Sequence, residues 1–350
     1  MTKINVSDYK DFYFKTALDV FNTPSPTGYY TEIAAVLEKY AAEVGAEFSR
    51  TNKGCFILTV KGKDDKTLGL AAHADTLGAM VRSFSGDKIN FTRIGGPLLS
   101  TYDGEYCTVI TRTGKKYTGT FLSVSPSKHV YTDGDTLEHT EDNMYVRLDE
   151  QVSCPDDFKK LGISSGDYIA LDPKTTVTPS DFLKSHFIDD KASVVTLLTV
   201  LKILKDNNIT PEHTLKVIIT MYEEVGHGAS YIPSDVTKLL CVDMGCIGKD
   251  LNCTENMVSI CAKDSHGPYD YDFTNELISL AKENGLDYAV DIYPYYGSDV
   301  GAMWTAGYDV PGALVGAGVH ASHGMERTHF NAIKNTISLV LLYIGVAAAK

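Results

Sequence analysis

The sequence predicts an α/β fold, in which helices flank a doubly wound mixed sheet and a small β-barrel-like domain is inserted. Apolar runs typical of buried strands alternate with helical stretches near both ends of the chain. Between them lies a stretch of short strand patterns and Gly-rich turns. We therefore assign residues 1–76 and 181–350 to the α/β host domain and residues 77–180 to the inserted β domain.

The first part of the host domain predicts two helices followed by two strands. Residues 8–21 carry apolar side chains at helical spacing, and Thr23–Gly28 (TPSPTG) predicts a turn that ends this helix. Residues 30–44 predict a second amphipathic helix, and the apolar runs at 54–60 and 68–72 predict strands.

The inserted stretch predicts a compact β domain. Arg112–Lys116 (RTGKK) is typical of a hairpin tip between the strand patterns CTVIT and KYTGTFL. MYVRLD and GDYIALDP predict further strands, and no long helical pattern interrupts them.

The α/β pattern then returns. Residues 192–204 predict an apolar helix, and the runs at 215–221, 239–242 and 313–315 predict buried strands. A last helical stretch covers residues 332–349. Alternating elements of this kind build a sheet that has helices on both of its faces.

Composition excludes several classes of protein. The net charge of -13, from 45 acidic and 32 basic residues, argues against a nucleic-acid partner, which would require a basic surface. No apolar run approaches the roughly 20 residues that span a bilayer, so we expect no membrane partner. The N-terminus lacks the apolar core of a signal peptide, and the odd number of cysteines, seven, fits a reducing compartment. We expect a cytoplasmic protein.

The cysteines Cys241, Cys246, Cys253 and Cys261 cluster in the sequence and raise the possibility of a zinc site. Their spacings are wider than the two-residue spacing of common zinc knuckles. We therefore expect them to be buried free cysteines.

Chemically useful side chains follow the predicted buried strands or precede the apolar helix. In an open α/β sheet the functional crevice lies outside the carboxyl ends of the strands, so these side chains should converge. Taken singly, each has an ordinary explanation: a solvated turn, a satisfied histidine or a helix cap. The places are His73, Glu223 with Glu224, Asp243, the loop with His320 and His323, and Asp189 with Asp190.

These residue types suit one chemistry. Zinc binds imidazole nitrogen and carboxylate oxygen, and a two-metal site needs a carboxylate that bridges both ions. Adjacent Glu223 and Glu224 could supply a ligand and a general base. Asp75, two residues after His73, could accept a hydrogen bond from the second ring nitrogen of that histidine.

Taken in order, these motifs resemble the tetrahedral aminopeptidases, metallopeptidase family forty-two of clan MH, which includes glutamyl, leucyl and deblocking aminopeptidases. The resemblance implies peptide substrates, a dimerisation role for the inserted domain, and a homo-oligomer between a dimer and a tetrahedral dodecamer. The matching segments are AAHADTLGAMV, FIDDKA, MYEEVGHGA, VDMG and YGSDVGAMWTAGYDVPGALVGAGVHASHGMERTH.

The resemblance also implies roles for the site residues around two divalent metal ions, zinc or cobalt. His73 and Asp243 would bind one ion, and Glu224 and a C-terminal histidine the other. Asp189 would bridge the two ions. Glu223 would act as the general base for an attacking water, and Asp75 would orient His73.

Two positions depart from the family pattern. Lys191 stands where the family usually has arginine, which keeps the charge but loses the planar fork. The C-terminal histidine usually precedes a glutamate by four residues, whereas His323 precedes Glu326 by three. We favour His323 as the ligand over His320, with His329 third.

Other interpretations stay open. The same ligands would serve a related di-zinc carboxypeptidase or amidohydrolase acting on a small acylated amino acid or dipeptide. A non-catalytic scaffold with the same fold is a further alternative, although the intact Glu223–Glu224 pair argues against it. Tyr293, Tyr295 and Tyr296 could line a substrate pocket or could pack in the core.

Overall fold

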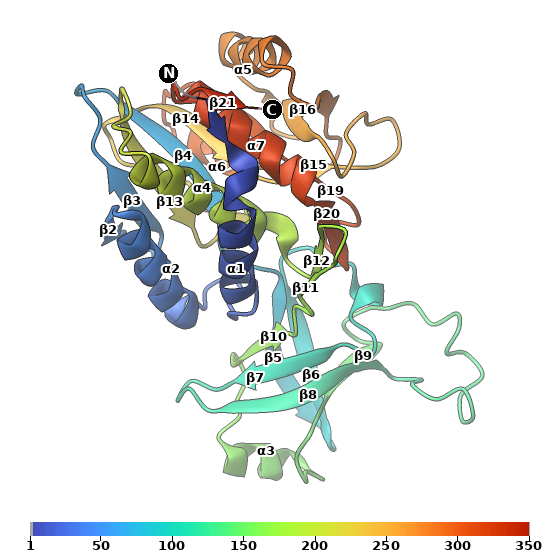
Figure 1. The fold of residues 1–350 in the computed structure, drawn as a ribbon. Coiled ribbons are helices and arrows are strands. Elements are labelled where there is room, and N and C mark those ends of the chain that lie inside the picture. The colour runs from blue at the N-terminus through green and yellow to red at the C-terminus, as the bar shows by residue number, and fades with distance from the viewer. Residues whose placement is uncertain (1–2, 350) are drawn as a thin grey trace.

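Four parallel strands form the middle of a ten-stranded mixed sheet in the computed structural model, which describes residues 3–349 (Figure 1). β4 and β19 are buried along their whole length, as expected for strands that are covered on both faces. In spatial order the four are β13 (Thr214–Thr220), β4 (Thr67–His73), β14 (Val236–Val242) and β19 (Gly312–Val319).

Antiparallel strands extend this sheet on both sides. β3 and β2 follow β13, while β16 and β17 follow β19. β18 pairs with β16, and β15 pairs with β19. Their bounds are β2 (Glu47–Arg50), β3 (Phe56–Val60), β15 (Gly245–Cys246), β16 (Val258–Asp264), β17 (Gly267–Pro268) and β18 (Tyr288–Ile292).

Helices cover both faces of the sheet, and the predicted fold is confirmed. Successive residues of β4 point to opposite faces of the sheet. Leu70 packs in a hydrophobic cluster with side chains of five helices, and Ala71 packs in a second hydrophobic cluster that includes side chains of α6. No helix in residues 3–349 has the length and hydropathy needed to cross a membrane. The five helices are α1 (Lys10–Phe21), α2 (Thr31–Val44), α4 (Ile188–Asp206), α5 (Tyr271–Glu283) and α7 (Phe330–Tyr343), and α6 is Asp299–Thr305.

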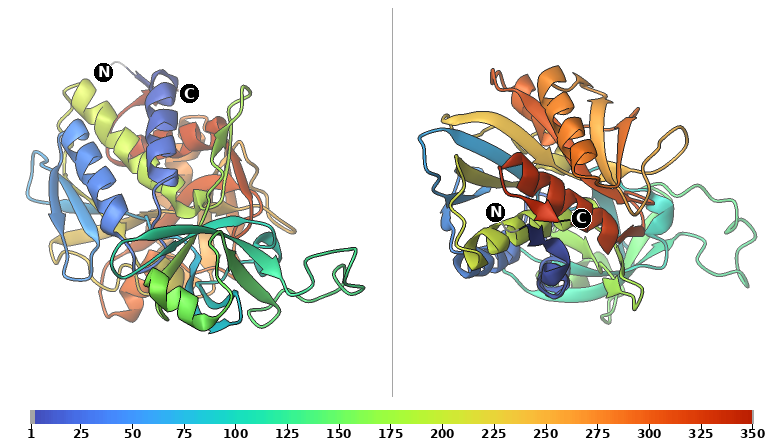
Figure 2. Two further views of the ribbon diagram at one scale, coloured as in Figure 1. Left: turned by 90° about the horizontal axis from the view of Figure 1, so that it is seen from below. Right: turned by 45° about the horizontal axis from the view of Figure 1, so that its top comes forward.

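A closed six-stranded barrel lies beside this domain, at the bottom of Figure 1. The short helix α3 (Pro155–Leu161) packs on it, where Phe158 stacks on Phe84 with 4.6 Å between ring centroids. Residues 124–143, between β8 and β9, extend away from the barrel in Figures 1 and 2. The strands are β5 (Gly78–Ser85), β6 (Lys88–Ile94), β7 (Tyr106–Ile110), β8 (Lys116–Ser123), β9 (Met144–Leu148) and β10 (Tyr168–Leu171).

A small sheet connects the barrel to the host domain. β12 (Phe182–Ser185) pairs with β11 (Thr176–Val177) on one side and with β20 (Glu326–His329) on the other. The chain that leaves the barrel therefore runs beside the C-terminal segment that carries candidate site residues. The domain boundaries at residues 77 and 180 stay a prediction.

The first and last described strands pair with each other, and the expected length of the C-terminal helix was wrong. The predicted helix over 332–349 ends at Tyr343, because Gly345 takes a positive φ of +82° and breaks the helical path. The last residues form β21 (Ala348–Ala349), which pairs in parallel with β1 (Ile4–Asn5) (Figure 2). At the other end, a 3₁₀ turn, η1 (Val6–Tyr9), precedes α1.

Candidate metal centre

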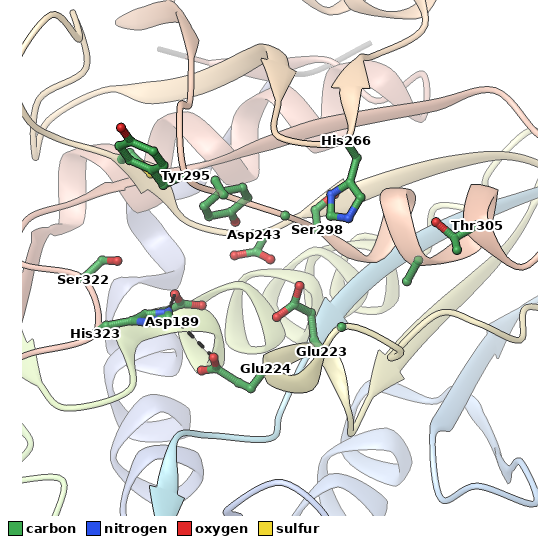
Figure 3. Close-up of a pocket in the computed structure, with 15 residues that line it drawn as sticks. Asp189, Glu223, Glu224, Asp243, His266, Tyr295, Ser298, Thr305, Ser322 and His323 are labelled. Atoms are coloured by element: carbon green, nitrogen blue, oxygen red, sulfur yellow. Dashed lines mark ion pairs between the residues drawn. The ribbon is translucent and has the colours of Figure 1, made fainter. Parts of the chain in front are cut away.

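The candidate residues gather at the carboxyl ends of the central strands. His73 is the last residue of β4, Asp243 directly follows β14, and Glu223 and Glu224 follow β13. The remaining members lie at the start of α4 and in the loop after β19. A cavity of about 560 Å³ opens over the centre (Figure 3), and five candidates line it: Asp189, Glu223, Glu224, Asp243 and His323.

Asp189 belongs to two groups of side chains that could each hold a metal ion. One group is His73, Asp189 and Asp243, and the other is Asp189, Glu224 and His323; within each, the ligand atoms lie within 4.8 Å of one another. Oδ1 of Asp189 lies 3.0 Å from Nε2 of His73, and Oδ2 lies 3.6 Å from Nε2 of His323. The two carboxylate oxygens of Asp189 thus face different groups, as a bridging carboxylate requires.

Asp75 positions both His73 and Glu223. The Nδ1 atom of His73 donates to the backbone carbonyl of Asp75 at 2.9 Å, whereas the carboxylate we expected to accept this bond lies 3.6 Å away. That carboxylate accepts instead from the backbone N–H of Glu223 at 3.2 Å and from the hydroxyl of Thr27 at 2.6 Å. Nε2 of His73 is therefore left facing the cluster.

Glu223 and Glu224 occupy a short 3₁₀ helix, η3 (Glu223–Val225), rather than the end of an extended strand. Three residues per turn place neighbouring side chains roughly 120° apart, so the two carboxylates point to different sides. Oε2 of Glu224 lies 3.7 Å from Nε2 of His323 (Figure 3). Oε2 of Glu223 lies 3.7 Å from Nε2 of His73. Glu223 belongs to neither ligand group.

Glu326 links the backbone of Asp189 to that of His323. Its buried carboxylate accepts from the backbone N–H of Asp189 and from that of His323, each at 2.9 Å. His323 itself has a positive φ of +63°, an unusual conformation for a residue with a side chain. The bonds from Glu326 stabilise the backbone at both of these candidate ligands.

The alternatives to His323 lie elsewhere. His320 is exposed and pairs its backbone with Arg327. The ring of His329 caps the N-terminus of α7. Neither residue belongs to either ligand group, whereas His323 does, and its Nδ1 atom donates to the carbonyl of Gly96 at 2.8 Å.

Negative charge in the centre exceeds what its own cationic groups balance. Burial and the charge of Asp189 raise the pKa of Asp243 to about 7 and that of Glu224 to about 8, and burial raises the pKa of Glu223 well above its usual value. Burial acts to lower the pKa of His323, but Asp189 and Glu224 raise it to about 10. A cluster of this kind is stabilised by bound cations.

The donor atoms fit divalent metal ions. Imidazole nitrogen together with carboxylate oxygen is the ligand set that zinc and similar ions prefer. Oε1 of Glu224 is buried and has no hydrogen-bond partner in the described part of the chain. A buried oxygen without a partner is costly, and a bound ion would relieve that cost.

Asp190 and Lys191, which follow Asp189, contact the backbone and not the cavity. Oδ2 of Asp190 accepts from the backbone N–H of His73 at 3.3 Å. Lys191 is buried and donates to the carbonyl of Thr23 at 2.6 Å, and burial lowers its pKa to about 7. The lysine at the family's arginine position therefore makes a backbone contact and does not line the cavity.

The wall of the cavity contains residues that sequence reasoning did not identify. His266, Ser298 and Thr305 line it together with Tyr295 and Tyr296. The labelled His266 and Thr305 lie on the side of Glu223 away from His323 (Figure 3). No sequence signal distinguished His266, because it lies in a turn between two antiparallel strands.

Two further residues near the wall have structural roles. Asp299 accepts from the hydroxyl of Thr220 at 2.6 Å and from the backbone N–H of Ala229 at 2.7 Å, and so fixes the segment around η3. The family-like segment that begins YGSDVGAMW includes Asp299 but did not indicate this role. Tyr293 is buried and bonds to Ser259, so it does not line the cavity.

Comparison with known proteins identifies relatives in sequence. The sequence profile of the M42 glutamyl aminopeptidase family matches residues 54–339. The chain is also 41% identical over 329 residues to the candidate aminopeptidase YhfE of Bacillus subtilis (strain 168). That alignment covers 93% of this chain and 95% of the relative.

Solved structures share the fold at lower sequence identity. The TET aminopeptidase of the marine sediment archaeon Thaumarchaeota archaeon SCGC AB-539-E09 matches with a TM-score of 0.87 at 18% identity, over 97% of both chains. The TET1 peptidase of Pyrococcus horikoshii matches with a TM-score of 0.81 at 18% identity, over 94% of this chain and 98% of that one.

Proposed function

The chain belongs to the M42 glutamyl aminopeptidase family and is a metal-dependent aminopeptidase, and we propose that it acts on peptides with two bound divalent ions, zinc or cobalt. The sharing of Asp189 between two ligand groups carries this proposal. His73 and Asp243 would hold one ion, Glu224 and His323 would hold the other, and Asp189 would contribute to both sites.

Glu223 is the general base in this proposal. Two divalent ions would polarise the scissile carbonyl and lower the pKa of the attacking water. Glu223 reaches the cavity without belonging to either ligand group. Its carboxylate takes a proton from the water as the water oxygen attacks the carbonyl carbon. It then gives that proton to the leaving nitrogen as the peptide bond breaks.

The cavity lining favours an aminopeptidase over a carboxypeptidase. Its four carboxylates, Asp189, Glu223, Glu224 and Asp243, would balance the charge of two divalent ions and leave no surplus positive charge for a substrate carboxylate. A carboxypeptidase needs a cation that binds the substrate carboxylate, but no lysine or arginine lies among the described residues of the cavity wall. This difference favours an aminopeptidase over a carboxypeptidase with the same ligands.

We further propose that the protein forms a homo-oligomer, between a dimer and a tetrahedral dodecamer, through a dimerisation domain at residues 77–180. The TET1 peptidase of Pyrococcus horikoshii, which shares the fold, assembles into a tetrahedron or a large octahedral shell. A cytoplasmic location fits the seven cysteines, all of which are free.

The test combines metal analysis with a substrate panel, on the wild type and on Glu223→Gln. The wild type should bind about two ions per chain. It should cleave dipeptides with a free amine and leave their N-acetylated forms intact. Glu223→Gln should keep both ions while activity falls by about 10²- to 10⁴-fold. Exclusive cleavage of the acetylated dipeptides, or full activity in Glu223→Gln, would contradict the proposal.

A further inference from the structure

One loop of the barrel reaches the candidate metal centre. Residues 95–102, here called the 95–102 loop, form the first part of the connection from β6 to β7 and include the 3₁₀ turn η2 (Leu99–Thr101). The carbonyl of Gly96 accepts from Nδ1 of His323 at 2.8 Å, and the backbone N–H of Leu98 donates to the carbonyl of His323 at 3.1 Å. The loop therefore holds this histidine by both its ring and its backbone.

The same loop packs closely against Glu224. Gly95 has a φ of +74°, and a Cβ atom at this position would lie 3.2 Å from the carbonyl oxygen of Glu224 and 3.5 Å from its Cβ. It would also lie 2.6 Å from a methyl group of Leu77. A side chain at Gly95 would thus press on Glu224 and Leu77.

The other ligand group depends on different partners. His73 bonds to Asp75 and Asp189 through its ring and to Asp190 through its backbone. Asp243 accepts from the backbone N–H of Met244. All of these partners lie outside residues 77–180.

The bond to Gly96 also fixes the protonation of the ring. A carbonyl can only accept, so Nδ1 of His323 carries the hydrogen in the neutral ring. The lone pair is then on Nε2, the atom that faces Asp189 and Glu224. This is the arrangement by which an outer hydrogen bond orients a metal-binding imidazole and raises its affinity for metal.

We propose that the 95–102 loop completes the site of the ion at Glu224 and His323, here called the second ion. Gly96 and Leu98 are the positioning residues for His323. The affinity for that ion then depends on the inserted barrel, and the affinity for the ion at His73 and Asp243 does not. This inference rests on the proposed function only in requiring that two ions bind.

Leu98 offers a matched pair of substitutions. Its φ of −76° suits proline and its side chain is 58% exposed, so Leu98→Pro can keep the backbone path of the loop. The substitution removes the N–H that bonds to His323 and sets the Cδ atom of the proline ring against the carbonyl oxygen that accepted this bond, which displaces His323. Leu98→Ala removes the side chain and keeps the N–H. In titrations with zinc or cobalt, Leu98→Pro should bind the second ion at least about tenfold more weakly, and the first ion as the wild type does. Leu98→Ala should match the wild type for both ions.

Gly95 gives an independent test. Gly95→Ala places a methyl group against Glu224, whereas Gly104→Ala introduces the same strain, at a φ of +84°, with no neighbour within 4 Å of the new atom. Gly95→Ala should weaken the second ion, and Gly104→Ala should not. The absorption spectrum of bound cobalt reports the change at the metal independently of activity, and circular dichroism confirms that each variant is folded.

The possible outcomes separate the two proposals. If Leu98→Pro bound each ion as tightly as Leu98→Ala does, and Gly95→Ala as tightly as Gly104→Ala does, this inference would be overturned. The proposed function would stay intact. A wild type that binds a single ion would overturn both. Selective loss of the second ion in Leu98→Pro and Gly95→Ala supports the inference even if the preferred substrate differs from a free-amine peptide.

Discussion

The two ligand groups around Asp189 are built in different ways. His73 and Asp243 are 1% exposed and sit where two adjacent parallel strands end. Glu224 lies in a 3₁₀ turn, and the side chain of His323, in an irregular loop, is 36% exposed. The first group takes its geometry from the sheet, and the second from hydrogen bonds between loops.

The difference has a physical consequence. A strand end is fixed by the ladder of bonds to its neighbours, so His73 and Asp243 are placed as soon as the sheet forms. The position of His323 depends on separate contacts to Glu326 and Gly96, each of which can be lost without disturbing the sheet. We therefore expect the second group to be the less stable and more easily altered half of the centre.

Removing Asp189 tests whether the two groups are one centre. Asp189→Ala should lower the metal content from about two ions per chain to none, and activity should fall by more than about 10⁴-fold. Asp243→Ala, which removes a ligand of the first group alone, should keep the ion at Glu224 and His323. Metal analysis after dialysis checks both variants, and retention of two ions in Asp189→Ala would show that the groups do not share this carboxylate.

The sequence predicted the first group more securely than the second. The runs before His73 and Asp243 are apolar and short, so their strand ends were visible, and the parallel order of the strands brought both residues together. The choice among His320, His323 and His329 could not be made by periodicity. It depends on the turn at His323 and on a carbonyl from the barrel, which are contacts between distant segments.

The missed features follow the same division. Alternation of apolar residues indicates strands and helices but not where irregular loops meet, so the two bonds of Glu326 and the packing of Gly95 left no signal in the sequence. The end of α7 could have been found. Gly345 is a usual helix stop, and the apolar residues after it obscured that signal.

Removing one histidine from each group sharpens the comparison. His323→Ala should weaken the second ion by at least about 100-fold and lower the stability of the metal-free protein by less than His73→Ala does, because the side chain of His323 is 36% exposed and that of His73 is 1% exposed. His73→Ala should also lower that stability by about 1 to 3 kcal/mol, since it leaves buried Asp189 without its closest partner. Urea unfolding in the presence of a chelator measures both, and equal effects would remove the distinction.

The pH dependence of the metal-free protein tests what the groups have in common, a carboxyl with a raised pKa. The pKa of Glu224 is about 8 in the native state against 4.5 in the unfolded chain, and that of Asp243 is about 7 against 3.8. Both carboxyls therefore keep protons in the native state that the unfolded chain releases. His323 (about 10 against 6.5) acts in the same direction at higher pH. The free energy of unfolding should therefore fall as pH rises from about 5 to about 8.

Bound metal should reverse this dependence, because the ions bind the deprotonated carboxylates and their affinity rises with pH. Urea unfolding at several pH values, with chelator and with saturating zinc, gives the two slopes. Slopes of the same sign would contradict the proposed ligand set.

The smallest expected effect is that of His320→Ala, and it tests the assignment of His323 directly. His320 lies three residues earlier in the same loop, is exposed, and contributes backbone bonds to Arg327 that an alanine preserves. Metal content, affinity and activity should therefore stay within about twofold of the wild type, since surface substitutions away from buried contacts have small effects. If His320→Ala lost the second ion and His323→Ala kept it, His320 would be the ligand and His323 would not. The loop would then have to rearrange when the metal binds, so the ligand group held by loops would differ even more from the group held by the sheet.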